Sequence, residues 1–196
     1  MAKPVVLILA AGRSERFRAA GGSSDKLDAL FTTATGTRSV LDHVIAAAQA
    51  SGLPWLVVRA ADTAHHAEQG MGTSIATGVA ATADAPGWLV LPGDLPLVQP
   101  SSLQAVAQAL AQGHAVVVPE VQGHKGHPVG FASVCRDALM ALRGDQGARA
   151  VVQAHSAHAL PLADIGCITD VDTPELLQQA QAQAQGLAHQ TPPRHA

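Results

Sequence analysis

The chain has 196 residues and a formal net charge of −3; 47% of its residues are hydrophobic and only 14% are charged. This composition supports a folded core and excludes an intrinsically disordered chain, which combines low hydrophobicity with high charge. An acidic chain with 3% aromatic residues also lacks the broad basic face and the stacking platforms of nucleic-acid-binding proteins, so we expect no nucleic-acid partner.

Apolar runs alternate with helical patterns along the chain. Residues 5–9 form an unbroken aliphatic run, which is typical of a central parallel strand covered on both faces. A polar loop over 10–25 follows, and then a helix over 39–50 whose apolar residues recur three and four apart. Further strands are predicted over 55–58, 88–91, 115–118, 158–160 and 166–168. Further helices are predicted over 73–83, 100–112, 134–142, 148–154 and 174–188, with a turn and a short extended segment over 123–131.

Strands that alternate with helices predict an α/β fold, a three-layer α/β/α sandwich around a mostly parallel, Rossmann-like sheet. We expect one domain over 1–188 and a flexible tail over 189–196. The apolar N-terminal run is too short for a membrane span or a signal peptide, so we expect a cytoplasmic protein with no membrane partner. Two cysteines, Cys135 and Cys167, are too few for a disulfide framework, and we expect both to be buried and reduced.

Polar residues follow the first predicted strand, at the carboxyl end where open α/β sheets bind ligands. The chain reads Ala10-Ala11-Gly12-Arg13 there and reaches Lys26 further on. Small residues let backbone N–H groups approach an anion, and Arg and Lys add positive charge. The alternative is an ordinary strand-to-helix turn with solvated arginines. The loop lacks the three spaced glycines of a dinucleotide site, which argues against an oxidoreductase.

Acidic residues follow the strand over 88–91 and precede the last helix. Mg²⁺ binds to one or two carboxylates plus substrate phosphates, so Asp94 and Asp172 are candidates for a metal pair. Carboxylates that merely cap turns are the alternative. In an extended segment Asp170 would lie on the same side as Asp172. Gly72 and Ser74 open a predicted helix, and their small size suits the close approach of a base or a ribose.

Six segments of the chain occur in an order that is found in one known family: LAAGRSERF…DK, GMGTSIATGV, LVLPGDLPLV, GHPVGF, GDQGARAVV and DVDTPELL. Over residues 4–180 the chain resembles the MobA-like nucleotidyltransferases, and among them the molybdenum cofactor cytidylyltransferases. The resemblance implies the fold of the nucleotide-diphospho-sugar transferases. It also implies transfer of CMP from CTP to the terminal phosphate of a molybdopterin cofactor, with release of pyrophosphate. The Ala10-Ala11-Gly12 form implies CTP, because the guanylyl branch typically has Ala-Gly-Gly there.

The resemblance also implies roles for individual residues. Arg13, Lys26 and Asp94 match catalytic positions, and Asp94 with Asp172 matches the ligands of Mg²⁺. The implied nucleotide-binding residues are Ala10, Ala11, Gly12, Arg13, Lys26, Gly72 and Ser74. The implied acceptor-binding residues are His127 and Pro128. The implied partners are CTP, a molybdopterin-type cofactor and a molybdoenzyme that receives the product.

The chain departs from the family pattern at two places. Segment 18–25 is longer than usual, and segment 60–69 is too short for the usual helix and strand, which predicts that one strand of the sheet is missing. Two other functions stay open: a guanylyl- or sugar-phosphate nucleotidyltransferase of the same fold, and a non-catalytic carrier of molybdenum cofactor. A metal pair at Asp94 and Asp172 favours catalysis, because a carrier needs none.

Overall fold

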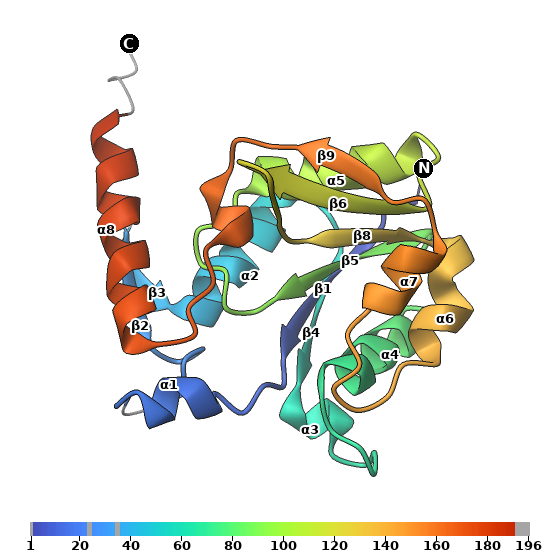
Figure 1. Cartoon of the computed structure of the whole chain (residues 1–196), viewed down its shortest axis with the longest axis horizontal. Helices are drawn as coiled ribbons and strands as arrows, with labels where there is room; N and C mark the ends of the chain where they lie inside the picture. The colour runs from blue at the N-terminus through green and yellow to red at the C-terminus, as the bar shows by residue number, and fades with distance from the viewer. Residues whose placement is uncertain (1, 23–24, 34–35, 191–196) are drawn as a thin grey trace.

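The computed structural model describes residues 2–22, 25–33 and 36–190. The strands of its main sheet are β1 (Val5–Ala10), β4 (Trp55–Arg59), β5 (Gly87–Pro92), β6 (Val116–Val121), β7 (His124–Lys125), β8 (Val129–Ala132) and β9 (His158–Pro161). They pair in the order β4-β1-β5-β8-β6-β7, and β9 also pairs with β6, in parallel (Figure 1). Among these described strands, only β7 and β8 run against the common direction. The predicted α/β fold with a mostly parallel sheet is therefore confirmed.

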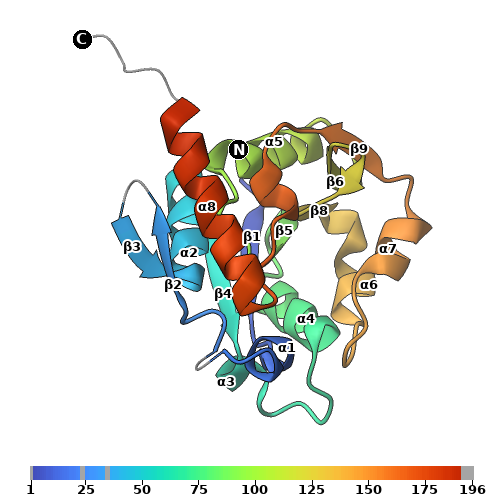
Figure 2. The same ribbon diagram turned by 60° about the vertical axis from the view of Figure 1, so that its left-hand side comes forward.

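Helices cover both faces of this sheet. The α-helices of the described residues are α1 (Glu15–Ala19), α2 (Val40–Ser51), α3 (Ala60–Thr63), α4 (Met71–Ala81), α5 (Pro100–Ala111), α6 (Arg136–Met140), α7 (Arg149–Ala154) and α8 (Pro174–Gln190). The helices α2 and α5 pack on one face, and α4 with α6 and α7 on the other (Figures 1 and 2). The ends of α2 follow from local sequence: the Ser39 hydroxyl accepts a hydrogen bond from the Asp42 N–H, and Gly52 adopts φ 68° at the other end.

Strand β1 consists of apolar residues throughout because both of its faces are buried. Val6 and Ile8 belong to the apolar cluster beneath α2 and α5, whereas Val5 and Leu7 belong to the cluster that contains Trp88 on the opposite face. Successive side chains of a strand point to opposite faces, so a strand covered on both sides must be apolar throughout.

Three local features differ from the sequence prediction. Residues 15–19, expected in a loop, form α1, and the hairpin of β2 (Leu30–Thr33) and β3 (Gly36–Ser39) was not predicted. The strand predicted over 166–168 is wrong. A 3₁₀ helix occupies Ile165–Ile168 instead, because the Asp164 carboxylate accepts a hydrogen bond from the Gly166 N–H at 2.9 Å and turns the backbone.

Segment 60–69 contains the short helix α3 and, over residues that the structure describes, no strand. Strand β4 therefore ends the sheet, as the shortness of this segment predicted. At the C-terminus α8 extends to Gln190, so the first two residues of the predicted tail are helical, and the rest of it lies outside the described residues.

Both cysteines are buried and unpaired, as predicted. Burial, reinforced by the nearby Asp164 carboxylate, raises the pKa of the Cys167 thiol to about 12. Across the described part of the chain, we find no helix with the length and apolar character that crossing a membrane requires.

Candidate active site

Two adjoining cavities lie at the carboxyl ends of β1 and β5. The first cavity, of about 480 Å³, is lined by the segment that follows β1, the start of α4, the turn after β5 and Asp145. The second, of about 750 Å³, extends toward β7 and the segment before α8. Their common wall consists of Arg16, Lys26, Met71, Pro92, Asp94 and Asp172. A molecule in either cavity would therefore meet the same group of charged side chains.

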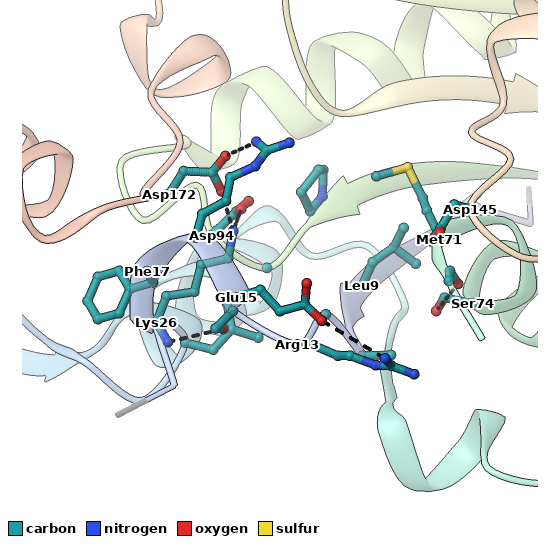
Figure 3. Close-up of a pocket in the computed structure, with 18 of the residues that line it drawn as sticks. Leu9, Arg13, Glu15, Phe17, Lys26, Met71, Ser74, Asp94, Asp145 and Asp172 are labelled. Carbon is teal, nitrogen blue, oxygen red and sulfur yellow. Dashed lines mark hydrogen bonds and ion pairs between the residues drawn. The ribbon is translucent and has the colours of Figure 1, made fainter. Parts of the chain in front are cut away.

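Lys26, Asp94 and Asp172 meet at this common wall (Figure 3). Lys26 Nζ donates to Asp94 Oδ2 at 2.5 Å and to Asp172 Oδ1 at 2.6 Å. Arg16 Nη1 donates to the other oxygen of Asp172 at 2.8 Å. The side chains of Lys26, Asp94 and Asp172 are only 15%, 14% and 24% exposed. Their charges are thus partly shielded from water, which strengthens the attraction between them.

Backbone contacts bring the two aspartates together from distant parts of the sequence. The Gly93 N–H donates to the Leu9 carbonyl at 2.9 Å, which fixes the turn after β5 against the end of β1. The Val171 N–H donates to the Asp94 carbonyl at 3.0 Å. The residue that follows Val171 is Asp172, so this bond places its side chain next to that of Asp94.

Ser14 fixes the position of Lys26. Its φ of 51° lies in the left-handed region, which is uncommon for residues other than glycine. In this conformation the Ser14 hydroxyl donates to Asp25 Oδ1 at 2.7 Å and accepts from the Lys26 N–H at 3.2 Å. These bonds close the loop at its base. The additional length between Phe17 and Lys26 therefore does not displace Lys26 from the site.

The ion pairs at the common wall favour the charged forms of Lys26 and Asp172. Burial favours a lower pKa for Lys26, but the Asp94 and Asp172 carboxylates outweigh burial and raise the pKa. Burial favours a higher pKa for Asp172, but Lys26 and Arg16 lower it. For His127 burial is the stronger effect. It lowers the pKa of the imidazole more than the neighbouring Asp94 charge raises it.

The two aspartates meet the geometric requirement for sharing a cation. One oxygen of each lies within 2.6 Å of the same Lys26 nitrogen, so a positive charge placed between them contacts both. In the described residues no group of three or more His, Cys, Asp or Glu side chains is arranged to hold a metal ion. Two carboxylates alone fit a cation such as Mg²⁺, which takes its other ligands from water and substrate phosphates.

Most of the predicted nucleotide-binding residues line the first cavity. Besides Lys26, these are Ala11, Gly12, Arg13 and Ser74. The Arg13 side chain is 71% exposed and lies 3.9 Å from Glu15, so it is available to a ligand. Ala10 and Gly72 line neither cavity: Ala10 ends β1, and Gly72 is buried against the loop over 143–147.

Of the two predicted acceptor-binding residues, one lines a cavity and the other does not. His127 lines the second cavity, and its backbone N–H donates to the Cys167 carbonyl at 2.8 Å. Pro128, joined to His127 by a cis peptide bond, is buried and lines neither cavity. Asp170 also lines the second cavity, whereas Asp172 pairs with Lys26. The geometry therefore favours Asp172 over Asp170 as the partner of Asp94.

The structure adds residues to which the sequence analysis gave no role. Arg16 pairs with Asp172 across the common wall, and His124 and Lys125 line the second cavity. Asp145 lines the first cavity from a loop far along the chain. Arg16 and Asp145 both lie in the segments that carried the family resemblance, but only the folded chain shows which cavity each of them faces.

The chain is similar in sequence to one known protein family and to one curated protein. A family model described as the MobA-like NTP transferase domain matches residues 6–159. The purine catabolism protein PucB of Bacillus subtilis strain 168 is 32% identical over 114 residues. That alignment spans 56% of this chain and 55% of PucB, so the chain spans about half the length of this curated relative.

Solved structures share the fold at low sequence identity. Rv0371c of Mycobacterium tuberculosis H37Rv, in a complex with manganese, has a TM-score of 0.64 and 20% identity, over 92% of this chain and 98% of that one. The 2-C-methyl-D-erythritol 4-phosphate cytidylyltransferase of Thermus thermophilus has a TM-score of 0.65 and 20% identity, over 93% and 98% of the two chains. The common feature is the fold that surrounds the two cavities.

Proposed function

We propose that this chain, which belongs to the MobA-like NTP transferase domain family, is a nucleotidyltransferase that transfers CMP from CTP to the terminal phosphate of a molybdopterin-type cofactor. A phosphate oxygen of the acceptor attacks the α-phosphorus of CTP, the bond from that phosphorus to the bridging oxygen breaks, and pyrophosphate leaves. The observation that carries the proposal is the meeting of Lys26, Asp94 and Asp172 at the wall common to both cavities.

In this proposal the first cavity holds the nucleotide. The loop over Ala11 and Gly12 presents small residues and backbone N–H groups to the triphosphate, and Arg13 adds an exposed positive charge. Lys26 lies where the nucleotide phosphates would approach the second cavity. These residues bind and orient the triphosphate and stabilise the charge that develops on the departing pyrophosphate.

The second cavity suits an acceptor that carries a phosphate. Arg16, Lys26 and Lys125 line it, together with His124, His127 and the carboxylates of Asp94, Asp170 and Asp172. Two anions must approach each other in this reaction, and in our proposal the three positively charged side chains and a cation between Asp94 and Asp172 would reduce the repulsion between them. Positioning accounts for much of the catalysis, since holding the two reactants in line removes the entropic cost of a bimolecular encounter.

Asp94 and Asp172 would hold the divalent cation in this proposal; Rv0371c, which shares the fold, forms a complex with manganese. Such a cation, Mg²⁺ in our proposal, would supply Lewis-acid stabilisation of the phosphate charge. The Lys26 ammonium now contacts the same carboxylate oxygens. We therefore propose that Lys26 turns from the aspartates to the phosphates when the metal–nucleotide complex binds.

The decisive experiment measures pyrophosphate release with Mg²⁺, each of the four nucleoside triphosphates, and either a molybdopterin-type cofactor or a panel of sugar phosphates. We expect release with CTP and the cofactor. Release with GTP, or with a sugar phosphate, would replace our proposal by the corresponding alternative within the family. Cofactor binding without release for any nucleotide would indicate a carrier.

The variant Asp94→Asn tests the proposed metal site. It keeps the side-chain shape but removes the charge, and we expect turnover to fall at least a hundredfold, a typical loss on removing a group that stabilises transition-state charge. Asp84→Asn is the matched control, because Asp84 is exposed and lines neither cavity. Equal turnover in the two variants, with unchanged circular dichroism, would exclude a metal role for Asp94.

A further inference from the structure

Two acidic residues of the first cavity have no role in the proposed reaction: Glu15, which lies 3.9 Å from Arg13, and Asp145. Asp145 comes from the loop over 143–147, between α6 and α7, and lines the cavity with Gln69, Gly70, Met71 and Ser74. Figure 3 shows Asp145, Met71 and Ser74 at one end of the cavity and Lys26, Asp94 and Asp172 at the other. In the proposed binding mode the phosphates take the Lys26 end, so Asp145 faces the nucleoside.

The loop that carries Asp145 is fixed to the start of α4. The Gly72 N–H donates to the Gly144 carbonyl at 2.8 Å, and the Gly144 N–H donates to the Thr73 hydroxyl at 3.0 Å. A side chain on Gly70 would collide with Asp145 Oδ1 and with the Gly144 backbone. These contacts fix the backbone of the loop next to the cavity, and the Asp145 side chain on that loop is exposed.

The Asp145 carboxylate differs from the other carboxylates of the site in its partners. Asp94 and Asp172 are paired with Lys26, and Asp172 also with Arg16. Asp145 has neither a hydrogen bond nor an ion pair to any residue that the structure describes. An ionised carboxylate only accepts hydrogen bonds, so its complement is an N–H or O–H donor. A phosphate or a carbonyl oxygen would be repelled there.

We infer that Asp145 is a specificity-determining residue that accepts a hydrogen bond from the nucleoside of the bound triphosphate. The inference rests on the proposed function, because it assumes that the first cavity holds a nucleotide. The exocyclic amine of cytosine and the hydroxyls of the ribose share the required donor chemistry. An amine contact discriminates against UTP, whose base carries a carbonyl oxygen in place of the amine.

The test compares Asp145→Asn with the wild type and with the control Asp137→Asn. Asparagine keeps the shape of the side chain, so folding should be unaffected, and Asp137 is an exposed residue of α6 outside both cavities. Equilibrium binding of CTP, UTP and dCTP is measured by calorimetry with Mg²⁺ present, and kcat/KM is measured with the acceptor. Binding reports on Asp145 even if no acceptor is turned over.

We expect Asp145→Asn to weaken CTP binding about tenfold or more, as for the loss of one charge-assisted hydrogen bond. If the amine is the donor, UTP binding stays the same or improves, because the new amide can donate to a carbonyl. If the ribose 2′-hydroxyl is the donor, CTP and UTP weaken equally and dCTP binding does not change.

Wild-type affinities for all three nucleotides in the Asp145→Asn variant would overturn the inference while leaving the proposed transfer reaction intact. Weakened CTP binding without turnover for any acceptor would support the role of Asp145 and refute the proposed reaction. Failure of the wild type to bind any nucleotide would refute both.

Discussion

Lys26 forms ion pairs with both aspartates at the centre of the site. Each carboxylate lies within 2.6 Å of its ammonium group, and all three side chains are largely shielded from water. Two carboxylates this close repel each other unless a cation lies between them. In the free protein that cation is the lysine, and in our proposed complex it is the divalent metal.

We therefore predict that Lys26→Met destabilises the free protein and makes it dependent on divalent cations. Without Mg²⁺ the free energy of unfolding should fall by about 1–3 kcal/mol, because Asp94 loses its counter-charge in a partly buried setting and Asp172 keeps only its pair with Arg16. Millimolar Mg²⁺ should restore more stability to the variant than it adds to the wild type. Thermal unfolding with and without Mg²⁺ measures both effects.

The control for this variant is Lys3→Met, since the exposed Lys3 only donates to the Gly52 carbonyl. An equal effect of Mg²⁺ on Lys26→Met, Lys3→Met and the wild type would mean that Asp94 and Asp172 do not share a cation.

At the scale of elements, the start of α4 depends on a tertiary contact. The sequence predicted a helix from residue 73, whereas the observed helix begins at Met71, with Gly70 before it at φ 150°. Hydrogen bonds from the loop over 143–147 hold this end of the helix. The same contact forms the Asp145 end of the first cavity, so stability and cavity shape depend on one interface.

Gly72→Ala tests this interface. The added methyl group would lie 2.5 Å from the Gln146 carbonyl oxygen and 2.8 Å from that of Arg143, and backbone atoms cannot rotate away. We expect a loss of about 1–3 kcal/mol in the free energy of unfolding, as for other overpacked sites. Urea denaturation followed by circular dichroism measures the loss.

The matched control is Gly186→Ala in α8, where an added methyl group meets no atom within 4 Å. This substitution should raise stability by about 0.5–1 kcal/mol, because alanine favours a helix over glycine. If both variants gain stability, α4 does not pack against the loop as described.

At the scale of the whole molecule, the two apolar clusters share the same strands, which agrees with one cooperative domain. Alternate residues of β1, β5 and β6 supply both clusters, one on each face of the sheet. Loss of either cluster would expose apolar side chains of the same strands to water. We therefore expect the two faces of the sheet to unfold together.

Two probes in one urea titration test this expectation. Trp88 is fully buried on one face, whereas Trp55 is 40% exposed at the edge of the sheet. In a Trp55→Phe variant the fluorescence reports on Trp88 alone, and far-ultraviolet circular dichroism reports on the helices of both faces. Coincident transitions indicate a single cooperative unit. A separate loss of helical signal would show that part of the chain folds independently.

The sequence alone determined the features that depend on local patterns. The unbroken aliphatic run over 5–9 predicted β1, and the three-four spacing of apolar residues over 39–50 predicted α2, because burial on two faces or on one face leaves a direct periodicity in the chain. The six motifs, read as a family resemblance, predicted the family, and the short segment over 60–69 predicted that one strand of the sheet is missing.

Only the tertiary structure decided how distant residues combine. No periodicity records that Val171 bonds to Asp94, that Ser14 in a left-handed conformation fixes Lys26, or that the loop over 143–147 closes on α4. These contacts join segments that are far apart in the sequence, and they form only when the sheet brings the carboxyl ends of its strands together. Arg16 and Asp145 therefore acquire a place in the site only in the folded chain.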